Sequence, residues 1–169
     1  MDALEAISSR RSIRKYTAEP VSEEAVETLL RAAMGAPSAN DEQPWHFVVI
    51  RKRALLDKIP AFHQYAKMLT EAPLAILICG DEKSAGHQGY LIQDCSAATE
   101  NLLIAAHAAG LGAVWLGIYP REQRMQGMRD LLGLPPQIMP IALVAIGHPG
   151  ERKPPSYRFK KDRIHLDRW

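Results

Sequence analysis

Cysteine is scarce in this sequence, and its scarcity excludes a disulfide framework. The two cysteines, Cys79 and Cys95, lie inside apolar segments and form no CxxC pair. Unpaired thiols of this kind are typical of a reducing compartment, so we expect a cytoplasmic protein. No apolar run reaches the roughly 18 residues of a membrane span, and the first residues lack the basic head and apolar core of a secretory signal. We therefore expect no membrane partner.

An excess of charge of one sign is also missing. The 169 residues carry 21 Lys or Arg against 19 Asp or Glu, a net charge of +2. This balance gives no reason to expect a nucleic-acid partner, so any anion has to be bound by a local cluster. With 47% hydrophobic and 24% charged residues, the composition is that of an ordinary folded protein. Its length fits one domain, residues 1–169, with a core of its own.

The motifs of several catalytic classes are absent. The six histidines show no HxxxH or HExxH spacing, so no metal site is expected, and no GxSxG or Walker A sequence occurs. Gly110 and Gly112 begin a dinucleotide-binding pattern, but Trp115 occupies the place of its third glycine. The sequence offers no evident acid, base or nucleophile. This is typical of a protein whose reaction is carried out by a bound phosphorylated cofactor.

One short segment is strongly basic and could bind such a cofactor. It reads Arg10-Arg11-Ser12-Ile13-Arg14-Lys15-Tyr16, with four cations and a hydroxyl in its first six residues. The planar guanidinium matches phosphate oxygens, and Ser12 adds a neutral donor, so we predict a phosphate clamp. A solvated basic face or a nucleic-acid patch is the alternative.

Apolar periodicity and turn residues predict alternating helices and strands. We expect helices over residues 2–9, 22–35, 54–59, 61–71, 90–109 and 121–132. We expect strands over residues 45–51, 74–79, 113–116 and 141–147, an ordered loop over 36–44, and a turn-rich approach to the last strand over 133–140. Strands separated by helices favour an α/β layered sheet over a β-sandwich.

Two features suggest a second subunit. The helix over 90–109 is apolar on nearly all sides, and its small residues Ser96, Ala97 and Ala98 would allow close approach of another chain, so we predict a homodimer. Residues 151–169 carry seven Lys or Arg against three Asp or Glu and show almost no apolar periodicity. They form either a frayed tail or an arm anchored on another surface by Trp169, and we favour the arm.

Taken together, these motifs resemble the nitroreductase family of FMN-dependent oxidoreductases in its short form. The matching stretches are the basic segment, Ala36-Pro37-Ser38 through Gln43-Pro44-Trp45 and His46-Phe47-Val48-Val49, Lys67-Met68-Leu69, Gly110-Leu111-Gly112-Ala113-Val114-Trp115-Leu116-Gly117, and the basic tail after Gly147-His148-Pro149. The resemblance implies an α+β fold, a three-layer α-β-α sandwich. It also implies that two interlocked subunits share two FMN sites at their interface.

The resemblance assigns the phosphate side of the FMN site to basic residues. Arg10, Arg11, Ser12 and Arg14 would hold the phosphate and ribityl chain. Arg152 and Lys153 would close on the phosphate from the other side, with Arg158 as a further candidate.

The resemblance also assigns the ring side of the site. Pro37, Ser38, Ala39 and Asn40 of the partner subunit would line the ring, and Gln43 would lie nearby or fix the loop. Gln64 and Lys67 would approach the pyrimidine edge, where a cation stabilises the reduced ring, although Lys67 could also be a plain surface lysine. Backbone groups of Trp115, Leu116 and Gly117 would lie near the reacting nitrogen, and Phe62, Tyr65 and Tyr119 could form the second-substrate pocket. The family loop commonly has asparagine where this chain has Asp41, which we expect to accept from a loop N–H.

The implied reaction is a ping-pong transfer of hydride. NADH or NADPH would reduce the flavin at N5 and leave, and a nitroaromatic, a quinone or a similar small acceptor would then be reduced in its place. Flavin enzymes of dehalogenation and flavin cleavage also resemble the family, so the resemblance leaves the acceptor open. A non-catalytic nucleotide- or RNA-binding module that uses the same basic segments is the rival hypothesis.

Overall fold

The computed structural model of the chain describes residues 1–154 and 156–169. Its four strands form one sheet in the order β1-β2-β4-β3. Their bounds are Trp45–Ile50 for β1, Leu74–Asp81 for β2, Gly112–Gly117 for β3 and Ile138–Gly147 for β4. All three neighbouring pairs are antiparallel, so the α/β type favoured by strand–helix alternation is wrong. The α4 helix joins the parallel strands β2 and β3, but β4 lies between them, and alternation along the chain does not reveal this insertion.

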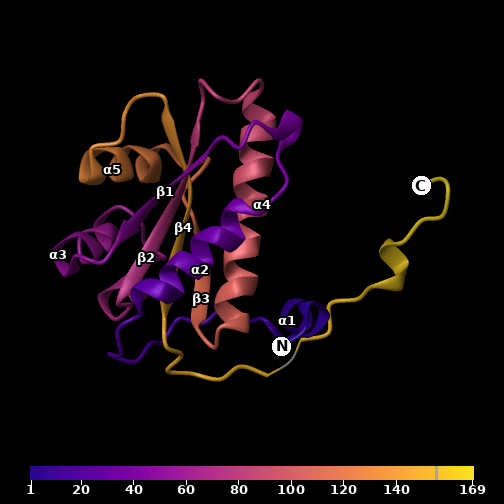
Figure 1. The fold of residues 1–169 in the computed structure, drawn as a ribbon, viewed down its shortest axis with the longest axis horizontal. Coiled ribbons are helices and arrows are strands. Elements are labelled where there is room, and N and C mark those ends of the chain that lie inside the picture. Colours follow the sequence, from indigo (N-terminus) through magenta and orange to yellow (C-terminus); the bar gives the residue numbers. More distant parts are fainter. Residues whose placement is uncertain (155) are drawn as a thin grey trace.

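Helices cover both faces of the sheet and give three layers (Figure 1). On one face pack α2 (Glu23–Met34) and α4 (Gln88–Ala108). On the other lie α3 (Arg53–Leu56), α5 (Glu122–Leu132) and the turns between α3 and β2. Because side chains alternate along a strand, Leu74, Ile76 and Ile78 of β2 enter the first core while Ala75, Leu77 and Cys79 enter the second. The three-layer α+β fold is therefore confirmed.

Capping residues set the starts of the first two helices where the sequence predicts them. Helix α1 (Ala3–Ser9) begins after Asp2, whose carboxylate accepts from Glu5 N at 3.0 Å. Helix α2 begins after Ser22, whose hydroxyl accepts from Ala25 N at 3.1 Å. Each cap satisfies one of the N–H groups that a helix start leaves without a partner.

Removing the α2 cap should weaken the fold measurably. We expect Ser22→Ala to lower the free energy of unfolding by about 1 kcal/mol, because the Ala25 N–H loses its acceptor. Urea unfolding followed by circular dichroism would measure the change, and Ser22→Asp, which keeps an acceptor, should retain near-wild-type stability. A Ser22→Ala protein as stable as the wild type would contradict the capping role.

The helix expected over 54–59 is shorter in the structure, and the helix expected over 61–71 is wrong. The structure has the four-residue α3 followed by single 3-10 turns at Ile59–Ala61 and Lys67–Thr70. Pro60 lies inside the first turn, and the Arg53 guanidinium donates to the carbonyls of Leu69 and Ala72, which holds the segment compact without a continuous helix. Strand β4 also begins earlier than expected, at Ile138, with a register irregularity beside Pro140, which has no N–H to donate.

The α4 helix is buried largely by its own chain. Ala98, predicted to face a second subunit, is completely buried in the core, so that part of the prediction is wrong; Ser96 and Ala97 are half-buried. The helix also places Cys95 against β2, where its Sγ donates to the Cys79 carbonyl at 3.5 Å. Burial raises the pKa of both thiols to about 12. Both cysteines are free and buried.

The C-terminal segment, residues 156–169, is exposed to solvent along its whole length. It extends away from the sheet and carries one short turn at Lys161–Arg163 (Figure 1). Tyr157 and Trp169 are fully exposed, and Trp169 stacks on His165 with ring centroids 4.2 Å apart. Among the residues that the structure describes, no helix combines the length and the apolar character needed to cross a membrane.

Candidate functional site

The basic segment of residues 10–16 is held along the outer edge of β3. Ser12 forms a parallel bridge with Ala113, and Ile13 N donates to the Ala113 carbonyl at 3.0 Å. This approach is close, because a Cβ on Gly112 would lie 2.7 Å from the Ile13 side chain. The Tyr16 hydroxyl donates to the Ile13 carbonyl at 2.7 Å. These contacts fix the backbone from which the basic side chains project.

Residues 151–154 return to the same backbone. Lys153 Nζ donates to the Ser12 carbonyl at 2.6 Å, and a Glu151 carboxylate oxygen accepts from Arg14 N at the same distance. The Arg14 N–H bond, together with Lys153, holds the pKa of Glu151 below its ordinary value. The Arg11 guanidinium donates to the Pro154 carbonyl at 3.0 Å. Segments that lie about 140 residues apart in the sequence thus meet.

Two cavities open beside this junction. A cavity of about 360 Å³ is lined by Arg11, Arg152 and Lys153, together with Ser9 and His107. A second of about 460 Å³ is lined by the cations Arg10, Arg11 and Arg158, and by Glu100 from α4.

Arg10 turns toward α4. Its Nε lies 3.3 Å from a Glu100 carboxylate oxygen, and its side chain is 16% exposed. This Nε is buried and has no hydrogen-bond partner among the described residues. Arg10 is therefore a nearly buried cation with spare donor capacity, on the side of the junction lined by Arg158.

The end of β3 forms another part of the site. The Gly117 carbonyl accepts from Arg124 Nη1 at 2.7 Å and lies 3.1 Å from His63 Nε2. A cavity of about 410 Å³ is open at this point, with main chain and side chains of eight residues around it: Arg14, His63, Tyr65, Met68, Trp115, Leu116, Gly117 and Arg124. Arg14 connects the basic segment to this cavity.

Burial, and after it the charge of Arg124, lowers the pKa of His63. A carbonyl can only accept, so the bond to Gly117 requires the proton on Nε2 and leaves Nδ1 as the acceptor of a neutral ring. Nδ1 is buried without a hydrogen-bond partner among the described residues. His63 is thus a neutral donor that helps to hold the end of β3.

The loop over residues 36–44 lies at the opposite end of α4. Ala39 N donates to Asp94 Oδ1 at 3.1 Å, and Ser38 Oγ accepts from Gln43 N at 3.0 Å. Asn40, Asp41 and Gln43 have φ values of 51°, 56° and 47°, which non-glycine residues seldom adopt. At 1.5 Å per residue, Asp94 lies about 20 Å along α4 from His107, which borders the basic junction. Within one chain, the loop and the basic junction are separate.

Comparison with known proteins identifies the family. The sequence model of the nitroreductase family matches residues 7–66 and 60–148. The chain belongs to the nitroreductase family. The resemblance found in the sequence motifs is therefore confirmed.

Full-length relatives share this assignment. A protein of Methanothermobacter thermautotrophicus named "Putative NADH dehydrogenase/NAD(P)H nitroreductase" is 48% identical over 169 residues, which is all of this chain and 88% of that protein. A crystal structure of the same name from Bacteroides thetaiotaomicron superposes with a TM-score of 0.95 at 42% identity, over 99% of this chain and 98% of that one. The structure of "a putative nitroreductase in complex with fmn" from Desulfovibrio desulfuricans gives a TM-score of 0.88 at 35% identity, over 100% and 98% of the two chains.

In this nitroreductase-family chain, the residues predicted from the sequence fall into three groups. Those of the basic segment and residues 152–153 come together at one junction. Trp115, Leu116 and Gly117 line one cavity, and Gln64 lines the cavity next to it, whereas Lys67 is exposed and lines neither. Pro37, Ser38, Ala39, Asn40 and Gln43 lie apart from both. Asp41 accepts from a loop N–H as expected, because its carboxylate takes a hydrogen bond from the side-chain amide of Gln43 at 2.7 Å.

Two residues of this site, His63 and Arg124, carry no recognisable sequence signature of their role. The spacing of the histidines gives no indication of a role for His63, and no sequence motif includes Arg124. The available signal was the pair Arg121 and Arg124, spaced i, i+3 at the start of the helix that follows Gly117. Among the described residues, no cluster of three or more His, Cys, Asp or Glu side chains could hold a metal ion.

The neutral state of His63 predicts a pH dependence of stability. The unfolded chain takes up a proton at this histidine near pH 6.5, whereas the folded chain does not until lower pH. The contribution of His63 to the free energy of unfolding should therefore be complete above about pH 7. It should fall as the pH drops through 6.5, by at most about 1.4 kcal/mol per pH unit from this group.

Urea unfolding between pH 5 and 8 would measure this slope, with His63→Gln as the comparison. The difference between wild type and variant should be constant above pH 7 and should shrink below pH 6.5. A difference that stays constant over the whole range would contradict a neutral His63.

Proposed function

We propose that this protein is an FMN-dependent oxidoreductase that uses NADH or NADPH to reduce nitroaromatics, quinones or similar small acceptors. The observation that carries the proposal is the meeting of two basic segments in a chain of the nitroreductase family: Lys153 donates to the Ser12 carbonyl, and Arg11 donates to the Pro154 carbonyl. The complex of a relative with FMN and the NAD(P)H in the names of others support the choice of cofactors. We also propose a cytoplasmic location, because both thiols are free.

The residues at the junction fit a phosphate group. Arg10 offers a buried Nε without a hydrogen-bond partner among the described residues, and Arg152 and Lys153 line the same cavity as Arg11. Arg11 already donates to the carbonyls of Ser8, Arg10 and Pro154. It would therefore attract a phosphate mainly through its positive charge and less through hydrogen bonds. Among the described residues, the cations of this junction have ion-pair partners in Glu100 and Glu151 alone, so the excess positive charge favours a bound anion. In our proposal the groups that hold the phosphate and ribityl chain are Arg10, Arg11, Ser12, Arg14, Arg152 and Lys153, with Arg158 beside them.

The end of β3 fits the ring of the cofactor. Two donors on the Gly117 carbonyl, from Arg124 and His63, immobilise the main chain of Trp115, Leu116 and Gly117 beside an open cavity. When bound, FMN would accept a hydride from NADH or NADPH and deliver it to the acceptor in a ping-pong order. The chain would orient the ring through this main chain, with Gln64 and Lys67 toward the pyrimidine edge. Apolar Met68 and Leu116 would limit access of water.

We further propose a homodimer, because one chain leaves the site incomplete. The loop that carries Pro37, Ser38, Ala39, Asn40 and Gln43 lies far from the junction in its own chain, so a partner subunit would have to supply it. Exposed apolar side chains support an interface: Leu4 and Ile7 on α1, and Tyr157, Phe159, Leu166 and Trp169 on the C-terminal segment. Ile7, Tyr157 and Phe159 line one cavity, and contiguous apolar surface of this kind commonly marks a protein contact.

The test is whether the purified protein binds flavin and turns over. We expect a yellow protein with one FMN per chain that oxidises NADH or NADPH when a quinone or nitro compound is supplied. A colourless protein that takes up no added FMN, and instead binds RNA with a strong salt dependence, would overturn the proposal in favour of the binding module.

A further inference from the structure

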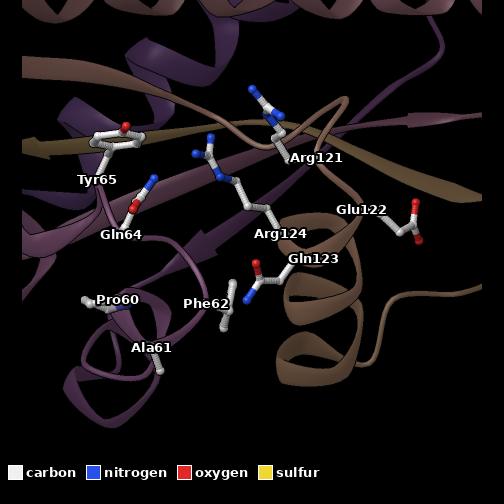
Figure 2. A pocket seen from close by; sticks show the side chains of 9 residues that line it. All are labelled: Pro60, Ala61, Phe62, Gln64, Tyr65, Arg121, Glu122, Gln123 and Arg124. Atoms are coloured by element: carbon white, nitrogen blue, oxygen red, sulfur yellow. The ribbon is translucent and has the colours of Figure 1, made fainter.

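A further cavity lies between the turns that precede β2 and the start of α5. It has a volume of about 600 Å³, and Figure 2 shows the side chains around it. Gln64 and Tyr65 stand on one side, and Arg121 and Arg124 on the other. Phe62 packs against α5 where Gly127 leaves room, since a Cβ there would lie 2.4 Å from the Phe62 ring. Its wall also includes Pro60, Ala61, Glu122 and Gln123.

Arg124 is a fixed cation at the boundary of this cavity. Its Nη1 donates to the Gly117 carbonyl at 2.7 Å, and its guanidinium carbon lies 5.5 Å from the centre of the Tyr65 ring. One bond and one stacking contact hold the side chain and leave further N–H donors of the guanidinium for a ligand. In Figure 2 the guanidinium is directed toward Tyr65 and Gln64, across the cavity.

Arg121 adds a second cation that its own chain does not neutralise. It is exposed at the N-cap of α5, where its side chain makes no capping bond. No carboxylate lies within ion-pair distance of its guanidinium in the part of the chain that the structure describes. Glu122, the acidic residue of the wall, points away from Gln64 and Tyr65 (Figure 2). The wall of the cavity therefore carries two guanidinium groups against one carboxylate, a net positive charge.

The cavity adjoins the one at the end of β3. Tyr65 and Arg124 line both, so a molecule that reacts at a ring held beside Gly117 can place a substituent between Arg121 and Arg124. Two guanidinium groups, a side-chain amide and an aromatic wall suit an oxyanion on an organic molecule.

We propose that this pocket of Gln64, Tyr65, Arg121 and Arg124 binds an oxyanion, a phosphate or a carboxylate, carried by the electron donor or by the acceptor. The inference rests on the proposed oxidoreductase function and names the class of substrate that the site prefers. The pocket would favour anionic substrates over neutral ones of the same shape and would make that preference decrease with salt.

Arg121→Gln tests the pocket without touching the bond that holds Gly117. We expect kcat/KM for an anionic substrate to fall about threefold to tenfold, because a contact with a solvent-exposed cation, weakened by screening, is lost. The donor arm compares NADPH and NADH with 1-benzyl-1,4-dihydronicotinamide, which carries no phosphate. The acceptor arm compares 4-nitrobenzoate with neutral 4-nitrobenzamide. Glu122→Gln should raise kcat/KM for the anionic member slightly, and Arg31→Gln on α2, paired with Glu27, is the matched control for charge.

A loss confined to NADPH and NADH would support the pocket with the donor phosphates as its ligand. A loss confined to 4-nitrobenzoate would support it with the acceptor carboxylate. Unchanged values in both arms, or equal losses for charged and neutral substrates, would overturn it even if the protein is a functional flavoenzyme.

Calorimetric titration with 4-nitrobenzoate and with NADP⁺ in the absence of turnover gives a second readout. Binding of at least one of them should weaken by the same factor in Arg121→Gln, and equal binding by wild type and variant would overturn the pocket. If the wild type takes up no flavin, the proposed function fails, whereas this titration still tests the pocket.

Discussion

Replacing Arg10 and Ser12 together by alanine should weaken FMN binding about 100-fold or more while the chain stays folded. A charge-assisted hydrogen bond contributes roughly 1.5–3 kcal/mol and a neutral one about 1 kcal/mol, and each 1.4 kcal/mol is a factor of ten in affinity. Arg10 is suited to this role because its Nε is buried and without a hydrogen-bond partner among the described residues. Flavin-fluorescence titration of the apoprotein would measure the dissociation constant.

Two further variants make this measurement specific. Arg31→Ala removes an exposed cation of α2 and should leave FMN affinity unchanged. Glu100→Gln removes the carboxylate 3.3 Å from Arg10 Nε and should leave affinity equal or higher, since Arg10 then has no competing anion. Full flavin content in the Arg10 and Ser12 double variant, with unchanged circular dichroism, would exclude this cluster as the phosphate site.

Removing residues 156–169 should convert the protein into a monomer that loses FMN. These residues are exposed on their own chain, and Tyr157, Phe159, Leu166 and Trp169 present large apolar surfaces to water. If the segment lies on a partner subunit, its removal takes away that burial, at roughly 1.5–3 kcal/mol for each large apolar side chain. Sedimentation velocity at micromolar concentration would report the association state.

The truncated chain should keep its body folded, because the segment contributes no residue to either core. Its thermal midpoint and helical signal provide the check. Arg163→Ala, which changes only an exposed charge of the same segment, is the control and should remain dimeric. A truncated protein that sediments as the wild type does would rule out the segment as a dimer contact.

Local signals were sufficient to predict most elements of the fold. Ser22 and Gly35 mark the limits of α2, aromatic and β-branched residues mark β1, and a short apolar run marks β2, because these signals act over a few residues. The place of β4 between β2 and β3 depends on long-range pairing and could not be read locally. Between α3 and β2 the apolar spacing resembles a helix, but Pro60 and the Arg53 bonds to Leu69 and Ala72 favour turns.

In the candidate site, too, local signals could be predicted from the sequence and long-range contacts could not. The concentration of charge at Arg10, Arg11 and Arg14 was evident from the sequence, and the family resemblance brought Lys153 to it, as the bond to Ser12 now shows. His63 could not be recognised, because a single histidine in an irregular segment carries no periodic signal. Its role depends on the carbonyl of Gly117, 54 residues away along the chain.

The two buried thiols have a practical consequence for following the motions of this protein. Cys79 lies on the central strand β2, and Cys95 lies on α4 where the helix covers that strand. With pKa values raised to about 12 they are inert while the layers stay closed, since alkylating reagents attack the thiolate. The rate of iodoacetamide labelling would therefore report how often the sheet and its covering helix separate.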